Sequence, residues 1–144
     1  MILFVNVQID NFFVVFKSIN DIFYIIYTNK NKSIICYNLI KKWKINEIKY
    51  CHDNDDYAIN FRHYLDRENK RDLVVSASCF DNNIKGWNAN NWECILNLTK
   101  INKEGILLSS CFLNINNNIY VVTSSNFFGI IADPIKIFDF DGKK

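Results

Sequence analysis

Proline and glycine are scarce in this sequence, with one and four residues among 144. Asparagine is abundant instead, and it tolerates left-handed backbone and caps tight turns almost as well as glycine or aspartate. The scarcity therefore does not exclude a turn-rich fold, and many turn positions are expected to hold Asn. Hydrophobic residues make up 49% and charged residues 22%, which excludes extended disorder and predicts one packed domain.

A clustered basic excess is also lacking, because the net charge is +2 and the lysines are scattered among acidic residues. Surfaces that follow the phosphates of nucleic acids normally carry such a cluster, so no specific nucleic-acid partner is expected. The apolar N-terminal stretch Met1–Phe16 has no basic flank and is interrupted by polar residues. It therefore predicts neither a signal peptide nor a membrane span.

No Cys-x-x-Cys pair is present, and the five cysteines are at least fifteen residues apart. An odd number of widely spaced cysteines argues against a zinc site and a dense disulfide framework. The pattern favours reduced, partly buried thiols and a cytoplasmic location. The cysteines are Cys36, Cys51, Cys79, Cys94 and Cys111.

Catalytic signatures are missing as well, since the only histidines are His52 and His63 and neither stands beside a recognisable nucleophile. The sequence has no Gly-rich phosphate loop, nucleophile elbow or zinc-protease motif. The acidic run that follows His52 lacks calcium-loop spacing, which favours a solvated loop. No enzyme activity, metal or other cofactor is expected.

Short runs of β-branched and aromatic residues alternate with Asn, Asp and Lys clusters every eight to twelve residues, which predicts many short strands. Long helical periodicity is absent, so we expect an all-β fold. The twelve predicted strands are Ile2–Val7, Phe12–Phe16, Ile22–Tyr27, Ser33–Asn38, Trp43–Ile48, Tyr57–His63, Leu73–Ser78, Asn83–Trp87, Trp92–Leu98, Ile106–Phe112, Ile119–Ser124 and Ile135–Phe140.

The sequence repeats itself at an interval of about fifty residues. The middle unit, Arg71–Ser78 followed by Asp81–Asn88, recurs downstream and more faintly upstream. The aromatic residues Tyr37, Trp87 and Phe138 are 50 and 51 residues apart. A period of this length indicates one multi-stranded sheet per repeat.

The middle unit resembles the WD-repeat (Trp-Asp repeat) β-propeller family. Its Ser76-Ala77-Ser78, its turn residue Asp81 and its Trp87-Asn88 are similar to the second strand, turn and third strand of that repeat. A longer segment, from His63 to Ile95, is similar to a divergent propeller group of unicellular eukaryotes. The resemblance implies about three four-stranded antiparallel blades in a ring that is not closed.

The resemblance also implies a buried hydrogen-bond chain inside the middle blade. In the family such a chain joins a turn Asp, a loop His, a strand Ser and the Trp indole, and its value depends on every member being satisfied. The matching residues in this sequence are Asp81, His52, Ser76 or Ser78, and Trp87. The long loop after His52 departs from the pattern, so Asp81 as a simple turn cap stays an alternative.

Three blades cannot close a ring, because known propellers need at least four. The expected organisation is a stray outer strand in 1–9, blade 1 in 10–49, blade 2 in 50–99, and blade 3 in 100–142 without its last strand. The favoured interpretation is a fragment of a larger propeller. The alternatives are that two copies pair into a six-bladed ring, or that the chain is an open, partly ordered array or another all-β fold.

The expected function is a non-catalytic scaffold that binds an unidentified protein or peptide. The alternatives are self-association through the exposed edges Met1–Val7 and Ile135–Phe140 and, less favoured, a propeller enzyme. The loops after the second and fourth strands of each repeat offer mixed charges and aromatic residues to a protein partner. The candidate contact residues are Lys30, Lys32, Asp53, Asp55, Asp56, Lys100, Lys103, Phe127 and Phe128.

Overall fold

A computed structural model describes residues 13–29, 33–49, 51–52, 59–79, 82–101, 106–126 and 135–142. Within these ranges the chain is all-β, with eleven strands in three antiparallel sheets and no helix. The predicted fold class is thus confirmed at the level of an all-β chain of antiparallel sheets. The predicted strand Ile2–Val7 lies outside the described residues.

Each sheet is a simple up-and-down array of consecutive strands. Sheet 1 contains β1 (Phe13–Lys17), β2 (Phe23–Thr28), β3 (Ile34–Asn38) and β4 (Trp43–Ile48). Sheet 2 contains β5 (Ile59–Asp66), β6 (Arg71–Ser78), β7 (Ile84–Asn88) and β8 (Glu93–Leu98). Sheet 3 contains β9 (Ile106–Ile115), β10 (Asn118–Asn126) and β11 (Lys136–Asp139).

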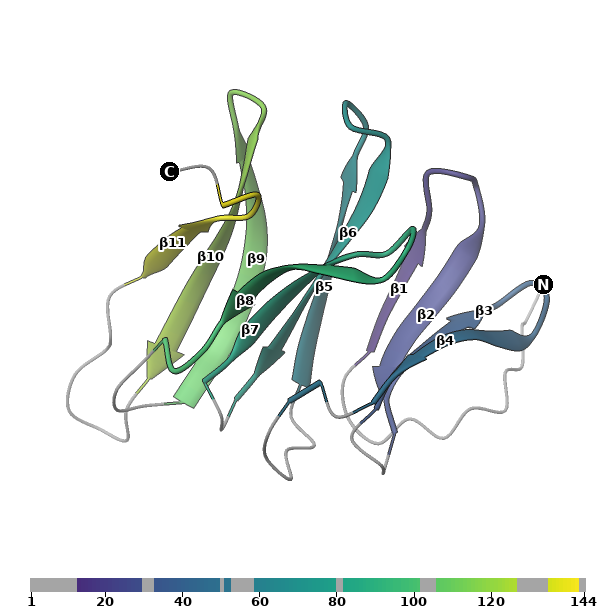
Figure 1. The fold of residues 1–144 in the computed structure, drawn as a ribbon, viewed down its shortest axis with the longest axis horizontal. Helices are drawn as coiled ribbons and strands as arrows, with labels where there is room; N and C mark the ends of the chain where they lie inside the picture. Colours follow the sequence, from purple (N-terminus) through teal and green to yellow (C-terminus); the bar gives the residue numbers. More distant parts are fainter. Residues whose placement is uncertain are drawn as a thin grey trace.

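The three sheets stand side by side in a row, with sheet 2 between the other two (Figure 1). The first strands of the sheets adjoin one another, because β5 contacts β1 on one side and β9 on the other. The last strands, β4 and β8, have many exposed side chains. This exposure agrees with the mixed polar and apolar sequence of these edge strands.

Two apolar layers fill the spaces between the sheets. The layer between sheets 1 and 2 contains Ile26 and Cys36 from sheet 1 and Phe61, Val74 and Trp87 from sheet 2. The layer between sheets 2 and 3 draws on the opposite face of sheet 2 and on β9 and β10. Sheet 2 is therefore covered on both faces, which explains why β6 is buried along nearly its whole length.

The fifty-residue repeat corresponds to equivalent positions in the three sheets. Tyr37 pairs with Ile25, Trp87 with Val74, and Phe138 with Val121, in each case between the second and third strands. Sheets 1 and 2 share a register shift at the step before Tyr37 and Trp87. We call the face that carries these aromatic positions the front face of each sheet, and the opposite face the back face.

Strand ends differ from the predictions where turn chemistry sets them. The hairpin between β9 and β10 turns at Asn116 and Asn117, both of which have positive φ. Two consecutive residues of this kind form the tight turn that matches the twist of paired strands. As a result β9 extends to Ile115, three residues beyond the predicted end at Phe112.

Candidate functional site

A buried hydrogen-bond chain lies on the front face of sheet 2, between this sheet and sheet 1. The indole Nε1–H of Trp87 donates to Ser76 Oγ at 2.9 Å, and Ser76 Oγ lies 3.0 Å from His52 Nε2. All three side chains are buried. The hydroxyl can donate to Nε2 when the imidazole carries its proton on Nδ1, so one Ser links an indole donor to a ring acceptor.

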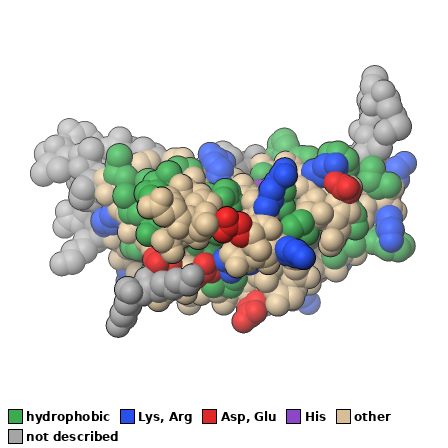
Figure 2. All heavy atoms as spheres, turned by 90° about the horizontal axis from the view of Figure 1, so that it is seen from above, with side chains coloured by type: hydrophobic (Ala, Val, Ile, Leu, Met, Phe, Trp, Pro, Cys, Tyr) green, Lys and Arg blue, Asp and Glu red, His purple; other side chains and the backbone are tan. Residues whose placement is uncertain are grey.

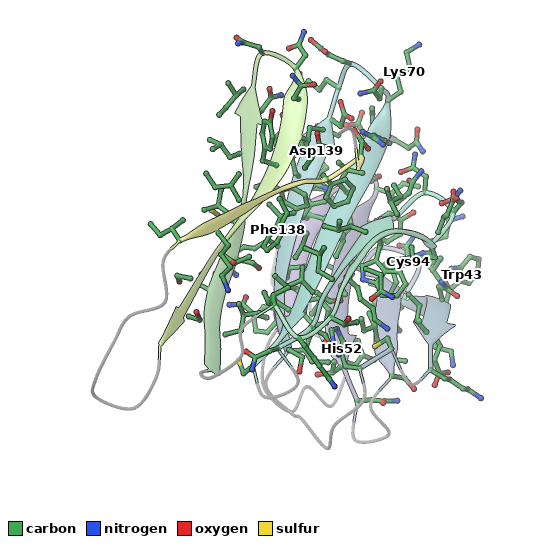
Figure 3. All side chains as sticks on the ribbon, turned by 60° about the vertical axis from the view of Figure 1, so that its left-hand side comes forward. Trp43, His52, Lys70, Cys94, Phe138 and Asp139 are labelled. Carbon is green, nitrogen blue, oxygen red and sulfur yellow. The ribbon has the colours of Figure 1, made fainter. Side chains whose placement is uncertain are left out.

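The structure brings together three of the five residues expected in this hydrogen-bond chain, namely His52, Ser76 and Trp87. Ser78, two residues beyond Ser76 on the same strand face, is buried, and its backbone N–H donates to the carbonyl of Asn83. Asp81 lies outside the described residues. His52 lies at the end of the sheets opposite the β5–β6 turn, which carries Lys70 (Figure 3).

A second polar cluster joins sheets 1 and 2 near the opposite ends of the strands and centres on Asp72. One carboxylate oxygen lies 2.8 Å from His63 Nε2, and the other accepts the backbone N–H of Ile19, in the β1–β2 turn of sheet 1, at 2.9 Å. The backbone N–H of Asp72 donates to the side-chain oxygen of Asn90. One buried carboxylate thus holds a turn of the neighbouring sheet.

The ring of His63 stacks on Phe16 of sheet 1 with centroids 3.9 Å apart. Burial lowers the pKa of His63, and this effect outweighs the hydrogen bond and the charge of Asp72, which would raise it. The ring therefore favours its neutral form in the folded chain. His63 and Asp72 both belong to sheet 2 and each contacts sheet 1, through the ring of Phe16 and the backbone of Ile19.

A cleft of about 370 Å³ opens beside Asp72, between sheets 1 and 2. Its apolar wall includes Phe16, Tyr24 and Trp92, and its polar groups come from the two sheets and their turns. This volume is within the range of known ligand pockets. The lining residues are Phe16, Ser18, Asn20, Tyr24, Cys36, Ile45, Asn46, Asp72, Ala89, Asn90, Asn91 and Trp92.

The turn that presents Trp92 to the cleft has an unusual backbone. Trp92 has φ 61°, and its N–H donates to the carbonyl of Asn88. The equivalent turn of sheet 1 has Lys42 in the same conformation, so the turn geometry requires it in both sheets. A bulky aromatic residue is rare in this region of backbone space. The left-handed conformation is therefore a property of this turn in both sheets, and in sheet 2 an aromatic residue occupies it.

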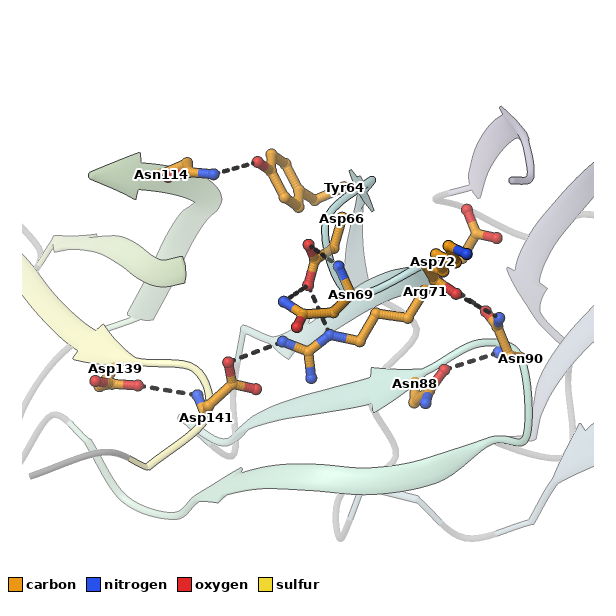
Figure 4. A network of polar contacts seen from close by, with 11 residues as sticks. Tyr64, Asp66, Asn69, Arg71, Asp72, Asn88, Asn90, Asn114, Asp139 and Asp141 are labelled. Carbon is orange, nitrogen blue, oxygen red and sulfur yellow. Dashed lines mark hydrogen bonds and ion pairs between the residues drawn. The ribbon is translucent and has the colours of Figure 1, made fainter. Parts of the chain in front are cut away.

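A polar network at the sheet ends joins sheets 2 and 3 (Figure 4). Arg71 donates to Asp66 at 2.7 Å within sheet 2 and to Asp141, just beyond β11, at 2.8 Å. Asn114 of β9 donates to the Tyr64 hydroxyl at 2.7 Å. Burial by itself would raise the pKa of Asp66, but hydrogen bonds from Arg71 and Asn69 outweigh it, and the pKa lies below its usual value.

Only one of the nine residues proposed for the contact face is described. Lys100 is exposed just after β8, and its backbone N–H donates to Asn83. The other eight, Lys30, Lys32, Asp53, Asp55, Asp56, Lys103, Phe127 and Phe128, lie outside the described residues. The cleft is at the other end of the strands, and sequence reasoning missed it. The only local signal for it was the Asn-Asn-Trp sequence at 90–92.

The thiols sort into a buried and an exposed set. Burial raises the pKa of Cys36 to about 12 and that of Cys51 to about 11, so both stay protonated and unreactive. Cys79 is half-buried, Cys94 and Cys111 are exposed, and none of the five cysteines forms a disulfide. Among the described residues, no three His, Cys, Asp or Glu side chains are grouped as metal ligands would be.

None of the described segments forms a helix that is long and apolar enough to cross a bilayer. Comparison of the chain with protein-family models, with curated proteins and with solved structures finds no match.

Proposed function

We propose that this chain is a non-catalytic scaffold of WD-type repeats that binds a protein segment or peptide in the cleft between sheets 1 and 2. In this proposal the three sheets are blades of a partial propeller. The equivalent positions of Tyr37, Trp87 and Phe138 support it, as does the hydrogen-bonded Ser76 beside Trp87. Five cysteines without a disulfide fit a reducing compartment such as the cytoplasm.

The cleft is the observation that carries the proposal. Its aromatic wall offers area for an apolar side chain. The amides of Asn90 and Asn91 are hydrogen-bonded within the chain, but each has a second N–H and a second oxygen lone pair, and Asn46 adds a further amide to the lining. An extended peptide presents the same two kinds of groups, because its backbone N–H and C=O alternate with side chains. The cleft therefore suits a short peptide segment with one apolar anchor better than a highly charged ligand.

The proposal can be tested by selecting peptides that bind the immobilised chain and measuring their affinity for two variants. Asn91→Arg places a long side chain at the exposed rim of the cleft. Asn97→Arg makes the same change at an exposed site on β8 that does not line the cleft. We expect selected peptides to lose at least tenfold in affinity with Asn91→Arg, a cost of about 1.4 kcal/mol, and to keep their affinity with Asn97→Arg.

Two results would contradict the proposal. One is that no peptide is enriched over a blank support. The other is that the enriched peptides bind the two variants equally well, which would place their site elsewhere. Circular dichroism and thermal unfolding of both variants show that the comparison is made between folded chains.

A further inference from the structure

The two internal contacts between sheets follow the same rule. The back face of sheet 1 packs against the front face of sheet 2, and the back face of sheet 2 packs against the front face of sheet 3. Each contact therefore joins a back face to a front face. Two faces stay without a described neighbouring sheet: the front face of sheet 1 and the back face of sheet 3.

The open face of sheet 1 is apolar and partly exposed. The exposed lysines Lys17 and Lys44 also lie on this face. Its exposed hydrophobic side chains are Phe13, Val15 and Phe23, with exposures of 55%, 49% and 42%. They adjoin the cross-strand partners Tyr27 and Ile25, which are buried. Aromatic and aliphatic groups thus run across neighbouring strands, as they do inside the two internal contacts.

The open face of sheet 3 has the same character. Leu113 and Ile115 of β9 and Ile137 of β11 are exposed on it, beside Tyr120 and Val122 of β10. Figure 2 shows hydrophobic side chains at the surface at both ends of the row of sheets. In contrast, no large hydrophobic side chain of sheet 2 is among the exposed ones in the described residues.

We propose that two copies of this chain associate head to tail, with the back face of sheet 3 of each copy against the front face of sheet 1 of the other. One chain has both faces that this contact needs, a front face and a back face. Faces of these two kinds already pack against each other twice within the chain. A contact between two different faces closes into a ring when the rotation allows it. Two copies then make six sheets and two equal contacts. Stable complexes bury roughly 800 Å² of surface on each partner, and here each copy would bury that area over two faces together.

The first measurement is the molar mass of the chain in solution by light scattering over a range of concentrations. The proposal predicts a single species at twice the chain mass of 17.0 kDa. A monomer at every concentration overturns it, because the open faces would then not bind a second copy. Polymers that grow with concentration also overturn it, because the contacts would then not close a ring.

Two single substitutions test which faces meet. Val15→Lys places a charge on the open face of sheet 1, and Ile137→Lys places one on the open face of sheet 3. Each side chain is about half exposed in the isolated chain, so folding tolerates the change. Each variant alone should be monomeric at concentrations where the unchanged chain is dimeric, because every possible head-to-tail contact contains a charged face.

An equimolar mixture of the two variants gives the decisive result. The Val15→Lys chain keeps an intact sheet 3 face, and the Ile137→Lys chain keeps an intact sheet 1 face, so one undamaged contact can form between them. We expect the mixture to recover a dimer that contains one copy of each variant. Recovery of no dimer overturns the proposal, and so does a Val15→Lys or Ile137→Lys chain that dimerises alone, which would indicate contact between two identical faces.

Ile40→Lys is the matched control. Ile40 is exposed in the β3–β4 turn and lies outside the strands that form the two open faces. This variant should stay dimeric, and its dissociation would mean that the association does not use the proposed faces. Circular dichroism of every variant identifies any that fails to fold, and Leu113→Lys then replaces Ile137→Lys on the same face.

Discussion

The two faces of sheet 2 differ in what holds them to their neighbours. On the front face, toward sheet 1, Ser76 of β6 joins Trp87 and His52 in hydrogen bonds. Val75 and Ala77, the neighbours of Ser76 in β6, point to the back face and pack in the apolar layer against sheet 3. Alternate residues of β6 thus face different sheets, and a buried hydroxyl occurs among the apolar residues of the front side.

The two faces of sheet 2 also differ in how closely the neighbouring sheet packs against them. On the back face, a Cβ added to Gly86 would lie 2.5 Å from the ring of Phe140, so sheet 3 approaches as closely as a residue without a side chain allows. On the front side, a cleft of about 370 Å³ remains beside Asp72. Both faces are thus held by an apolar layer and by polar contacts, and the front face differs in its buried hydrogen bonds around Ser76 and in the cleft that remains beside Asp72.

The largest expected effect comes from removing packing on the back face. Leu73→Ala deletes a fully buried side chain of the layer between sheets 2 and 3. The loss of transfer free energy and the cavity left behind should lower the free energy of unfolding by about 2–5 kcal/mol in urea denaturation. Ile40→Ala, at an exposed turn position, should change it by less than about 0.5 kcal/mol. Equal effects of the two changes would contradict the packing of Leu73 in the layer between sheets 2 and 3.

Breaking the hydrogen-bond chain of Trp87, Ser76 and His52 should have the next largest effect on the free energy of unfolding. Ser76→Ala leaves the Trp87 indole without its hydroxyl acceptor in a buried site, which should cost about 1–3 kcal/mol of unfolding free energy. The reciprocal change, Ala77→Ser, puts a hydroxyl into the apolar layer and should also destabilise the chain. If urea denaturation shows that Ser76→Ala is neutral or stabilising, the hydrogen bonds of Ser76 contribute nothing to the stability of the fold.

A smaller effect is expected for the two ion pairs of Arg71, one with Asp66 within sheet 2 and one with Asp141, just beyond β11. Arg71→Met removes a side chain that is 17% exposed and leaves Asp66 and Asp141 without their cation. We expect a loss of about 1 kcal/mol that shrinks at high salt, because the side chains of Arg71 and Asp141 stay partly exposed to water. The matched change Lys44→Met breaks an exposed pair with Glu47 and should have almost no effect on the thermal midpoint. A larger loss from Lys44→Met would reverse the assignment.

The smallest predicted effect concerns pH and His63. The folded chain holds the pKa of His63 below its ordinary value of 6.5, so folding favours the neutral ring. Its contribution is complete above pH 6.5 and is lost as the pH falls below that value, because the unfolded chain then binds the proton more readily. The thermal midpoint should therefore fall between about pH 7 and pH 5, and less so in His63→Gln. Identical pH profiles would exclude His63 as the source.

Local sequence pattern predicts most of the strands. Runs such as Leu73–Ser78 and Trp43–Ile48 are rich in residues that favour strands, and polar turns bound them. The fifty-residue spacing of Tyr37, Trp87 and Phe138 also anticipates their equivalent positions in the paired strands. Both predictions use information that a single sequence contains, namely the residue types within a short segment and the spacing of an internal repeat.

The contacts between sheets were much harder to predict. Asp72 holds the backbone of Ile19, 53 positions away, and Arg71 reaches Asp141, 70 positions away. Nothing in the local sequence of either residue indicates its partner, because the contact depends on how two sheets are placed side by side. The cleft was missed for the same reason, since it is a gap between sheets that are themselves predictable.

Hydrogen exchange of the three tryptophan indole protons, followed by NMR, tests most directly whether the front face is closed by a hydrogen-bond chain. Trp87 is buried and bonded to Ser76, whereas Trp43 is exposed and Trp92 lies at the cleft. The account predicts that the Trp87 proton exchanges far more slowly than the other two, and that Ser76→Ala removes most of this protection. Exchange of the Trp87 proton as fast as that of Trp43 would contradict it.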